Sequence, residues 1–281
     1  MPSRRRRRRG RRRVVPHRRG LFIALVFTVV VVVLLVAGIF AAGPLGEALR
    51  TVGSLAAGIG SPDAPATPVA PPESPAVSRS ASTPAALAGH AGEVDAEWAG
   101  RTAAATGIPL RAVQAYAGVA IASQNSGSTC HLGWNTLAAI GTVESANGTY
   151  AGSTIGADGT VSPPIYGIAL DGAGVTRIPD TDGGAIDGDA EWDRAVGPMQ
   201  LIPETWRNWG TDASGDGIAD PQNIDDASLA TANYLCYHGR DVSVASEWMA
   251  AITSYNDATS YLLKVSQYAN RYALEVASVT G

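Results

Sequence analysis

The pattern of apolar and polar positions divides the 281-residue chain into an apolar run, a stretch without periodicity and a series of helical segments. Residues 21–40 carry no charge, and an apolar run of about 20 residues is long enough to cross a bilayer. Residues 61–83 are rich in Pro, Ala and Ser. This composition cannot bury a core and is typical of an extended spacer. From about Glu97 onward, apolar residues recur at helical spacing.

Six downstream segments predict helices, because their apolar residues recur every three or four positions. They are residues 108–125, 134–145, 202–210, 225–239, 246–256 and 260–276. Alternating runs of β-branched residues, which would indicate strands, are scarce. The sequence therefore predicts a mostly α domain with a long loop at residues 146–193. A loop of that length inside a compact domain is usually functional.

The first 20 residues contain eleven arginines and no acidic residue. Arginines on the N-terminal side of an apolar run predict a cytoplasmic N-terminus by the positive-inside rule. We therefore expect a basic cytoplasmic tail at 1–20, a single transmembrane helix at 21–43, a flexible linker at 44–96 and a folded domain at 97–281. That domain would lie on the outer side of a bacterial cell membrane. A cleavable signal peptide, with residues 41–43 imitating its cleavage site, is the alternative.

The charge changes sign after the apolar run. Residues 44–281 carry all 25 acidic residues and ten of the 21 basic ones, so their net charge is −15. Such a surface argues against nucleic acid as a partner and leaves neutral glycans, cations and basic peptides. Beside a membrane span, the N-terminal arginines are better explained by topology or by contact with anionic lipid. We expect no organic cofactor.

The two cysteines, Cys130 and Cys236, both lie on the expected outer side of the membrane. In an oxidising compartment such a pair favours one disulfide. Two buried thiols are the alternative.

Glu144 lies near the end of the helix predicted over 134–145. Leu137, Gly141 and Glu144 share one helix face, so the carboxyl has apolar neighbours. Desolvation and the negative end of the helix macrodipole both raise its pKa above the usual value of about 4.3. Such a glutamate can hold a proton and donate it to a leaving oxygen. An idle, exposed glutamate at a frayed helix end is the alternative.

Amide and aromatic side chains elsewhere have the chemistry of a sugar-binding site. Gln200 follows the turn at Gly197-Pro198, and its amide offers both a donor and an acceptor. Tyr255, Asn256 and Tyr261 lie at the junction of two predicted helices, and aromatic faces stack on sugar rings. Each residue taken alone is equally compatible with packing.

The acidic loop at residues 212–226 has the spacing with which an EF-hand calcium loop begins. Oxygen-bearing side chains occupy positions 1, 3 and 5, and Gly217 occupies position 6, where the loop turns sharply. Position 12, usually a bidentate glutamate, is Asn223. The expected Ca²⁺ ligands are Asp212, Ser214, Asp216, Ile218 through its carbonyl oxygen, and Asp226. A surface loop rich in Gly and Asp is the alternative, and residues 180–189 form a second acidic loop that fits no such template.

In combination, these segments resemble the membrane-bound lytic transglycosylase B family. The resemblance runs from about Cys130 to Tyr272. It is carried, in unbroken order, by LAAIGTVESANG, DTDGGAIDGD, WDRAVGPMQLIPETW, the acidic loop, YLC and YN. It implies a lysozyme-like α domain that binds peptidoglycan glycan strands. It also implies cleavage of the bond between N-acetylmuramic acid and N-acetylglucosamine.

The resemblance implies a role for each matching residue. Glu144 matches the single catalytic acid/base. The matches to substrate-binding residues are Gln200, Tyr234, Tyr255, Asn256 and Tyr261. Some members of the family carry a calcium site at the place of the acidic loop, and Ile218 and Asn223 depart from that pattern, which bears on its affinity.

By this resemblance, Glu144 would protonate the glycosidic oxygen and then take the proton of the muramic acid 6-hydroxyl. Attack of that hydroxyl on C1 leaves a 1,6-anhydro ring, and the substrate's own N-acetyl group can stabilise the cationic centre. A second carboxylate is then not required. Two alternatives remain. One is a muramidase that uses Asp193 or Glu191 as its second acid, and the other is a catalytically idle wall-binding module.

Overall fold

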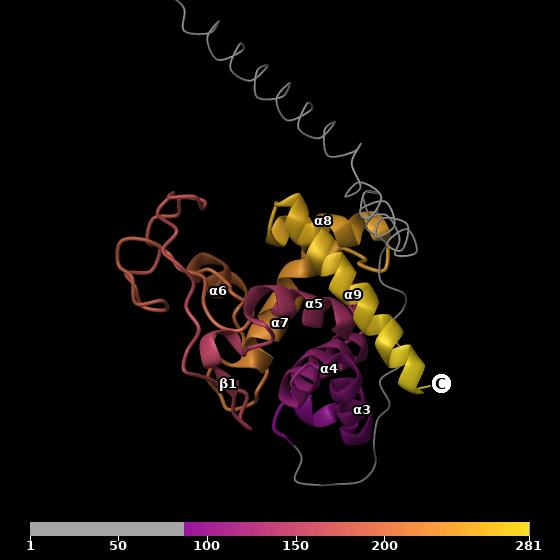
Figure 1. Ribbon diagram of the computed structural model, residues 1–281. Coiled ribbons are helices and arrows are strands. Elements are labelled where there is room, and N and C mark those ends of the chain that lie inside the picture. The colour runs from indigo at the N-terminus through magenta and orange to yellow at the C-terminus, as the bar shows by residue number, and fades with distance from the viewer. Residues whose placement is uncertain (1–86, 281) are drawn as a thin grey trace, which may run out of the picture. The chain divides into compact units, whose positions relative to one another are not determined.

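The computed structural model describes residues 87–280, which form a mostly helical domain (Figure 1). Its helices are α3 Ala96–Thr106, α4 Leu110–Asn125, α5 Trp134–Ser145, α6 Pro203–Trp209, α7 Ile224–Leu235, α8 Ala245–Tyr255 and α9 Thr259–Thr280. Short 3₁₀ helices are η1 His90–Glu93, η2 Tyr150–Gly152 and η3 Tyr237–Gly239, and one antiparallel pair joins β1 Thr154–Ile155 to β2 Val161–Ser162. The prediction of a mostly α fold is confirmed.

The expected basic tail and transmembrane helix at 1–43 lie outside the described residues. Within residues 87–280, no helix combines the length and the apolar character needed to cross a membrane. The membrane topology stays a prediction.

Helical structure begins before Glu97, within the range that the sequence assigns to the linker. The 3₁₀ helix η1 packs against α4, and the N–H of His90 donates to the carbonyl of Ala213 at 3.2 Å. Gly89 has a φ of 62°, and a Cβ there would lie 2.1 Å from the Ala213 carbonyl oxygen. The end of the expected linker is therefore part of the folded domain, because its backbone packs closely on the acidic loop.

Helix α3 is the one α-helix in residues 87–280 that the sequence pattern did not predict. Asp95 caps it, accepting a hydrogen bond from the N–H of Trp98 at 2.7 Å, and Gly107 ends it with a φ of 72°. Both are ordinary helix-end signals. The segment between them is rich in alanine, so its apolar periodicity is weak, although Trp98 anchors it in the core with 1% exposure.

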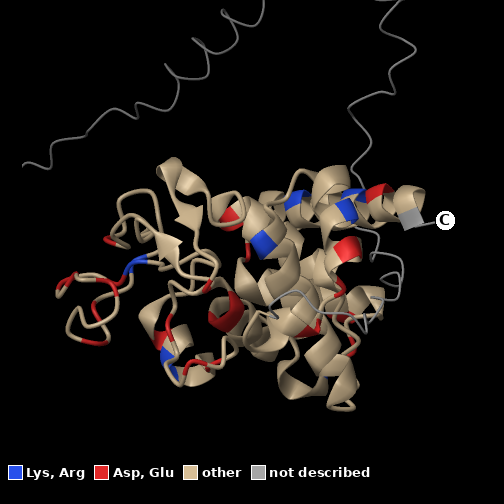
Figure 2. Ribbon diagram, turned by 90° about the horizontal axis from the view of Figure 1, so that it is seen from below, with Lys and Arg blue, Asp and Glu red and all other residues tan. Residues whose placement is uncertain are grey.

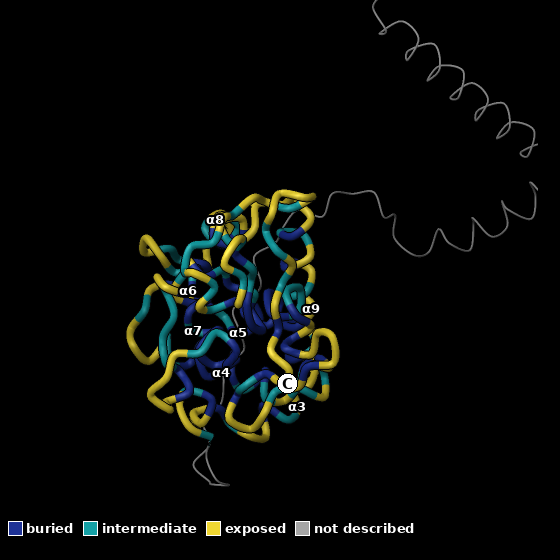
Figure 3. The backbone as a smooth tube through the Cα atoms, turned by 90° about the vertical axis from the view of Figure 1, so that its left-hand side faces the viewer, coloured by how far each residue is buried: buried dark blue, intermediate teal, exposed yellow. Residues whose placement is uncertain are grey.

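Helix α5 lies at the centre of the domain and has the bounds that the sequence predicted. Its first eight residues are all buried, and it packs against α4 and α9 (Figure 3). Trp134 meets Trp98 edge to face at 5.6 Å and stacks on Tyr272 at 6.4 Å. Gly141 allows α4 to come close, since a Cβ there would lie 2.1 Å from the Tyr116 hydroxyl oxygen. This packing fixes the end of α5, where Glu144 lies.

The predicted long loop has internal structure. Its first part forms η2 and the β1–β2 pair, and its later part extends away from the helices and returns (Figure 1). Isolated bridges pair Tyr166 with Val196 and Pro179 with Trp192, so the outgoing and returning halves of this segment are held together. The Arg177 guanidinium lies over the Trp192 ring at 5.0 Å. Residues 166–196 thus form a paired arm beside the helices.

Cys130 and Cys236 form a disulfide, with their Cα atoms 5.5 Å apart. This confirms the predicted pairing. The bond joins the loop before α5 to the residue that caps the end of α7.

We expect replacement of both cysteines by serine to lower the free energy of unfolding by about 2–5 kcal/mol, because the bond closes a long loop in the unfolded chain. Urea denaturation of the variant and of the oxidised wild type measures this difference. Reduced wild type is the matched control and should unfold at the variant's midpoint. Identical midpoints for the oxidised protein and the variant would contradict the expectation.

Candidate active site

A cleft of about 830 Å³ lies where the end of α5, the paired arm, the segment before α6, α7 and the α8–α9 junction meet. Five residues that the sequence singled out line this cleft: Glu144, Gln200, Tyr234, Tyr255 and Asn256. They come from four separate parts of the chain, which the fold brings to one place.

Glu144 lies partly buried on the last turn of α5, and Ala146 ends the helix in the left-handed region. The Tyr261 hydroxyl donates a hydrogen bond to Glu144 Oε1 at 2.6 Å. Burial raises the pKa of Glu144 to about 7, although the bond from Tyr261 acts in the opposite direction. The sequence predicted this direction, and burial is the largest cause. Near neutral pH the carboxyl can therefore hold a proton or release it.

Tyr261 does not line the cleft but supports Glu144 from within the domain. Its side chain is 7% exposed, and burial and the neighbouring Glu144 carboxyl raise its pKa far above the usual value for a tyrosine. The hydroxyl therefore stays protonated and acts as the donor to Glu144. The resemblance implied a substrate-binding role, whereas the geometry gives Tyr261 a positioning role.

Two hydrogen bonds join the three short motifs ES, GPMQ and YN. The hydroxyl of Ser145 donates to the carbonyl of Pro198 at 2.6 Å. The hydroxyl of Tyr255 donates to the carbonyl of Met199 at 2.5 Å. The backbone of the GPMQ turn is thus held between α5 and α8, beside Glu144.

The GPMQ turn is tight and strained. Gly197 has a φ of 74°, and a Cβ there would lie 1.8 Å from the Pro221 carbonyl oxygen. Gln200 also has a positive φ, 49°, which is uncommon for a residue with a side chain. Its Nε2 donates to the Gly197 carbonyl at 2.9 Å. Strain of this kind gathers at functional sites, and here it positions an amide at the cleft wall.

Aromatic rings form a continuous row beside Glu144. Tyr261 stacks on Tyr255 at 6.3 Å, Tyr255 meets Tyr234 edge to face at 5.7 Å, and Tyr234 meets Trp209 at 6.2 Å. The Tyr234 hydroxyl donates to the Ser254 carbonyl at 2.6 Å, which fixes that ring. Sequence analysis missed Trp209, whose position at the end of α6 was visible only as part of an apolar pattern.

Glu144 and Asp257 are the only carboxyl-bearing side chains among the residues that line the cleft, and no Lys, Arg or His is among them. Asp257 is exposed and follows Asn256 at the α8–α9 junction. The sequence did not single out Asp257, and it predicted a functional loop at 146–193 without indicating that Leu170 to Ile178 would line the cleft. No apolar periodicity marks that segment.

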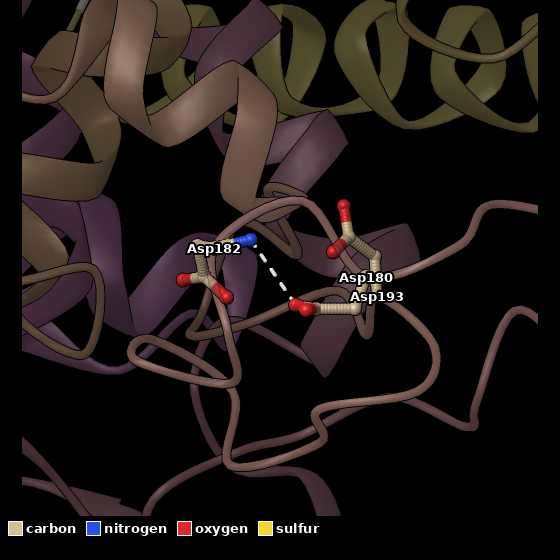
Figure 4. A group of neighbouring side chains, drawn as sticks. All are labelled: Asp180, Asp182 and Asp193. Carbon is tan, nitrogen blue, oxygen red and sulfur yellow. Dashed lines mark hydrogen bonds between the residues drawn. The ribbon is translucent and has the colours of Figure 1, made fainter.

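The second acids expected for a muramidase lie away from the cleft lining. Asp193 is fully buried, and its carboxylate accepts hydrogen bonds from the backbone N–H and the hydroxyl of Thr181, each at 2.9 Å. It belongs to a group with Asp180 and Asp182 within the arm (Figure 4). In that group the N–H of Asp182 donates to Asp180 at 3.1 Å. Asp193 therefore stabilises the arm, and Glu191 lies on the same arm.

The EF-hand-like loop lies between α6 and α7, away from the cleft lining. Asp226 accepts N–H donors from Ala213, Ser214 and Asp220 at 2.8–3.0 Å. In residues 87–280, the group of Asp180, Asp182 and Asp193 is the only set of three acids close enough to share an ion. The acids of the EF-hand-like loop do not converge in this way, and calcium binding there stays a prediction.

Comparison with known proteins finds one family. Residues 184–242 match the family model described as Transglycosylase SLT domain. No curated protein and no solved structure gives a significant match. The matched segment contains Gln200 and Tyr234 but neither Glu144 nor the α8–α9 junction. The match supports a lytic-transglycosylase-like domain with a lysozyme-like fold, and the finer assignment to the membrane-bound B family is part of the proposal below.

We expect Tyr261→Phe to raise the pKa of Glu144 above about 7, because it removes the one hydrogen bond that lowers it. Carboxyl-carbon NMR titration of the full-length chain measures this pKa directly. Tyr268→Phe is the matched control, since it removes a tyrosine hydroxyl from the same helix. A Glu144 pKa that is unchanged or lower in Tyr261→Phe would show that the bond does not set the protonation of Glu144.

Proposed function

We propose that the chain is a peptidoglycan lytic transglycosylase in which Glu144 is the single acid/base. The observation that carries the proposal is a partly buried glutamate with a pKa of about 7 in a cleft whose lining is mostly aromatic, amide, hydroxyl and apolar, with Asp257 as its one other carboxyl. The SLT-domain match over residues 184–242 supports the same reaction class. Within that class we assign the chain to the membrane-bound B family, on the motifs around Glu144, Gln200 and Tyr255.

In this mechanism the protonated Glu144 donates its proton to the glycosidic oxygen as the bond to C1 breaks. Glu144 is then a carboxylate, and it accepts the proton of the muramic acid 6-hydroxyl. As that proton leaves, the 6-oxygen forms a bond to C1 and closes the 1,6-anhydro ring. Glu144 is then protonated again, as at the start. Tyr261 holds Oε1 throughout, which leaves the other carboxyl oxygen to exchange the proton.

The other cleft residues would bind and orient the sugar rings. Tyr234 and Tyr255 offer aromatic faces, and their hydroxyls are already bonded to backbone carbonyls, so they act mainly by stacking. Gln200 and Asn256 offer amides that can bond N-acetyl and hydroxyl groups. Uncharged groups of this kind suit a neutral glycan.

A muramidase is the competing reaction, and Asp257 is the only other carboxyl in the cleft that could serve as its second acid. Two-carboxylate glycosidases need both acids. A binding module would need neither.

We expect full-length protein to release fragments ending in 1,6-anhydromuramic acid from purified peptidoglycan, read by mass spectrometry. Glu144→Gln should reduce the rate about 10²–10⁴-fold, the usual contribution of a general acid–base. Asp257→Asn is the matched control and should keep the same products. Reducing-end products that depend on Asp257 would establish the muramidase, and binding without cleavage by folded wild type would establish the wall-binding module.

The rate should fall as the pH rises through about 7, because Glu144 must start protonated and its pKa lies there. In Tyr261→Phe the fall should move to higher pH. Initial rates of anhydro-product formation between pH 5 and 9 measure both curves. A wild-type rate that stays constant up to pH 9 would contradict the role of Glu144 as the acid.

We also infer that residues 212–226 bind Ca²⁺ as a structural ion, on the spacing of their oxygen-bearing side chains. We expect chelation to lower the melting temperature of the full-length protein by several degrees, and added Ca²⁺ to restore it. Asp216→Asn removes one charge at an exposed position of the loop. This variant should have the same melting temperature with and without chelator. Equal melting temperatures with and without chelator would exclude a structural calcium site.

The N-terminal basic tail and apolar run lead us to propose a single-pass membrane anchor that places the domain on the cell-wall side. This part of the proposal rests on the sequence alone.

A further inference from the structure

A second cavity of about 530 Å³ lies between α5 and α9. Its lining consists of Thr142, Val143, Lys264, Gln267, Tyr268 and Arg271. Thr142 and Val143 directly precede Glu144, so this cavity and the main cleft flank the same turn of α5. The proposed chemistry makes no use of it.

The charge of this cavity is opposite to that of its surroundings. Residues 87–280 contain 22 acidic and eight basic residues, whereas the cavity lining has two basic residues and no acidic one. The Arg271 guanidinium lies over the rings of Tyr268 and Tyr272 at 5.1 and 4.9 Å, which holds it in place. Its Nε is 3.4 Å from Glu275, so part of its charge is already balanced.

Lys264 has no such partner. It makes no ion pair, hydrogen bond or aromatic contact with any residue between 87 and 280. The other seven basic side chains in that range each contact a carboxylate, a backbone carbonyl or an aromatic ring. Lys264 is therefore the unpaired cation of a strongly acidic domain, and it lines a cavity with hydrogen-bond donors beside it.

The position of the two cations along α9 relates them to the main cleft. Tyr261, on the same helix, bonds Glu144, and Lys264 follows three residues later. At about 1.5 Å per residue, Lys264 lies about 5 Å and Arg271 about 15 Å along the helix from Tyr261. An extended peptide of four residues spans at most about 14 Å. Measured along α9, the step from Tyr261 to Lys264 is well within the span of such a peptide, whereas the step to Arg271 is at its limit.

The substrate of the proposed reaction carries negative charge, which is complementary to the positive charge of this cavity. Muramic acid units bear short peptides with free carboxylates, while the residues that line the main cleft include no cation, and Asp257 among them repels a carboxylate. We propose that the cavity between α5 and α9 binds a carboxylate of the peptide stem, with Lys264 as its main partner. This inference rests on the proposed function for its choice of substrate.

Binding of the free stem tetrapeptide to the full-length chain tests the inference without any need for catalysis. Lys264→Gln should weaken binding roughly tenfold, the size of one charge-assisted hydrogen bond. Arg101→Gln is the matched control, since it removes one exposed positive charge from α3 and should leave the affinity unchanged. A tetrapeptide whose carboxylates are amidated should bind wild type as weakly as the native peptide binds the variant.

Cleavage assays separate failure of this inference from failure of the proposed function. Wild type should cleave stem-bearing strands about tenfold faster than strands stripped of their peptides, measured as kcat/KM. Lys264→Gln should lose that preference while keeping the wild-type rate on stripped strands.

Equal wild-type rates on both strands, or equal peptide affinity in wild type and Lys264→Gln, would overturn the stem site and leave the proposed transglycosylase function intact. If neither strand is cleaved, the proposed transglycosylase function is overturned. The peptide-binding measurement would still test whether the cavity between α5 and α9 binds the stem. Tight binding of inorganic phosphate without peptide binding would instead identify the cavity as a site for phosphate-bearing polymers.

Discussion

The contact between the Glu144 carboxyl and the Tyr261 hydroxyl, at 2.6 Å, is the interaction on which the chemistry of the cleft depends. A partly buried carboxyl loses hydration, and a neutral hydroxyl replaces only part of it. Asp241 shows the opposite environment in the same domain. It is partly exposed, and hydrogen bonds from Ser243 and His131 hold its pKa at about 2. Glu144 has no cation beside it in the cleft, and its pKa is therefore raised to about 7.

A single hydrogen bond can position Glu144 only if both helices that carry the pair are fixed. Helix α5 is buried over its first eight residues, and α9 packs along it through Tyr272, which stacks on Trp134. The Asn135 amide adds a bond to the Ala269 carbonyl at 3.1 Å. The core thus determines the distance between the carboxyl and the hydroxyl, and the strained GPMQ turn is tied to the same frame through Ser145.

The parts of this site that could be predicted are those with a local signal. Helix α5 was predicted with its observed bounds because its apolar residues recur at helical spacing. The raised pKa of Glu144 followed from the same apolar surroundings. Its partner Tyr261 could not be predicted by local reasoning, because 117 residues separate the two. The loop that contains the arm was expected to be functional from its length, but its pairing and its place at the cleft could not be predicted, because isolated bridges hold it and no periodic pattern marks them.

The EF-hand-like spacing shows how a local signal can have two physical origins. In the loop at residues 212–226, Asp212 accepts the N–H groups of Gly215 and Gly217. In the arm, Asp180 accepts those of Gly183 and Gly184 in the same manner. Aspartates alternating with glycines satisfy backbone donors in irregular segments with or without an ion. The acidic loops therefore owe much of their composition to the hydrogen bonds that their aspartates accept from the local backbone.

This origin of the acidic charge also explains its distribution. Acidic residues gather on the loops beside the helices, including the paired arm (Figure 2). They serve the local backbone, and a domain with a large negative charge generally disfavours anionic groups near its surface. A neutral glycan is unaffected by that field, but an anionic substituent on the glycan needs a compensating cation. Lys264, in the cavity lined by Thr142 and Val143, would supply that cation without placing a positive charge among the residues that line the cleft.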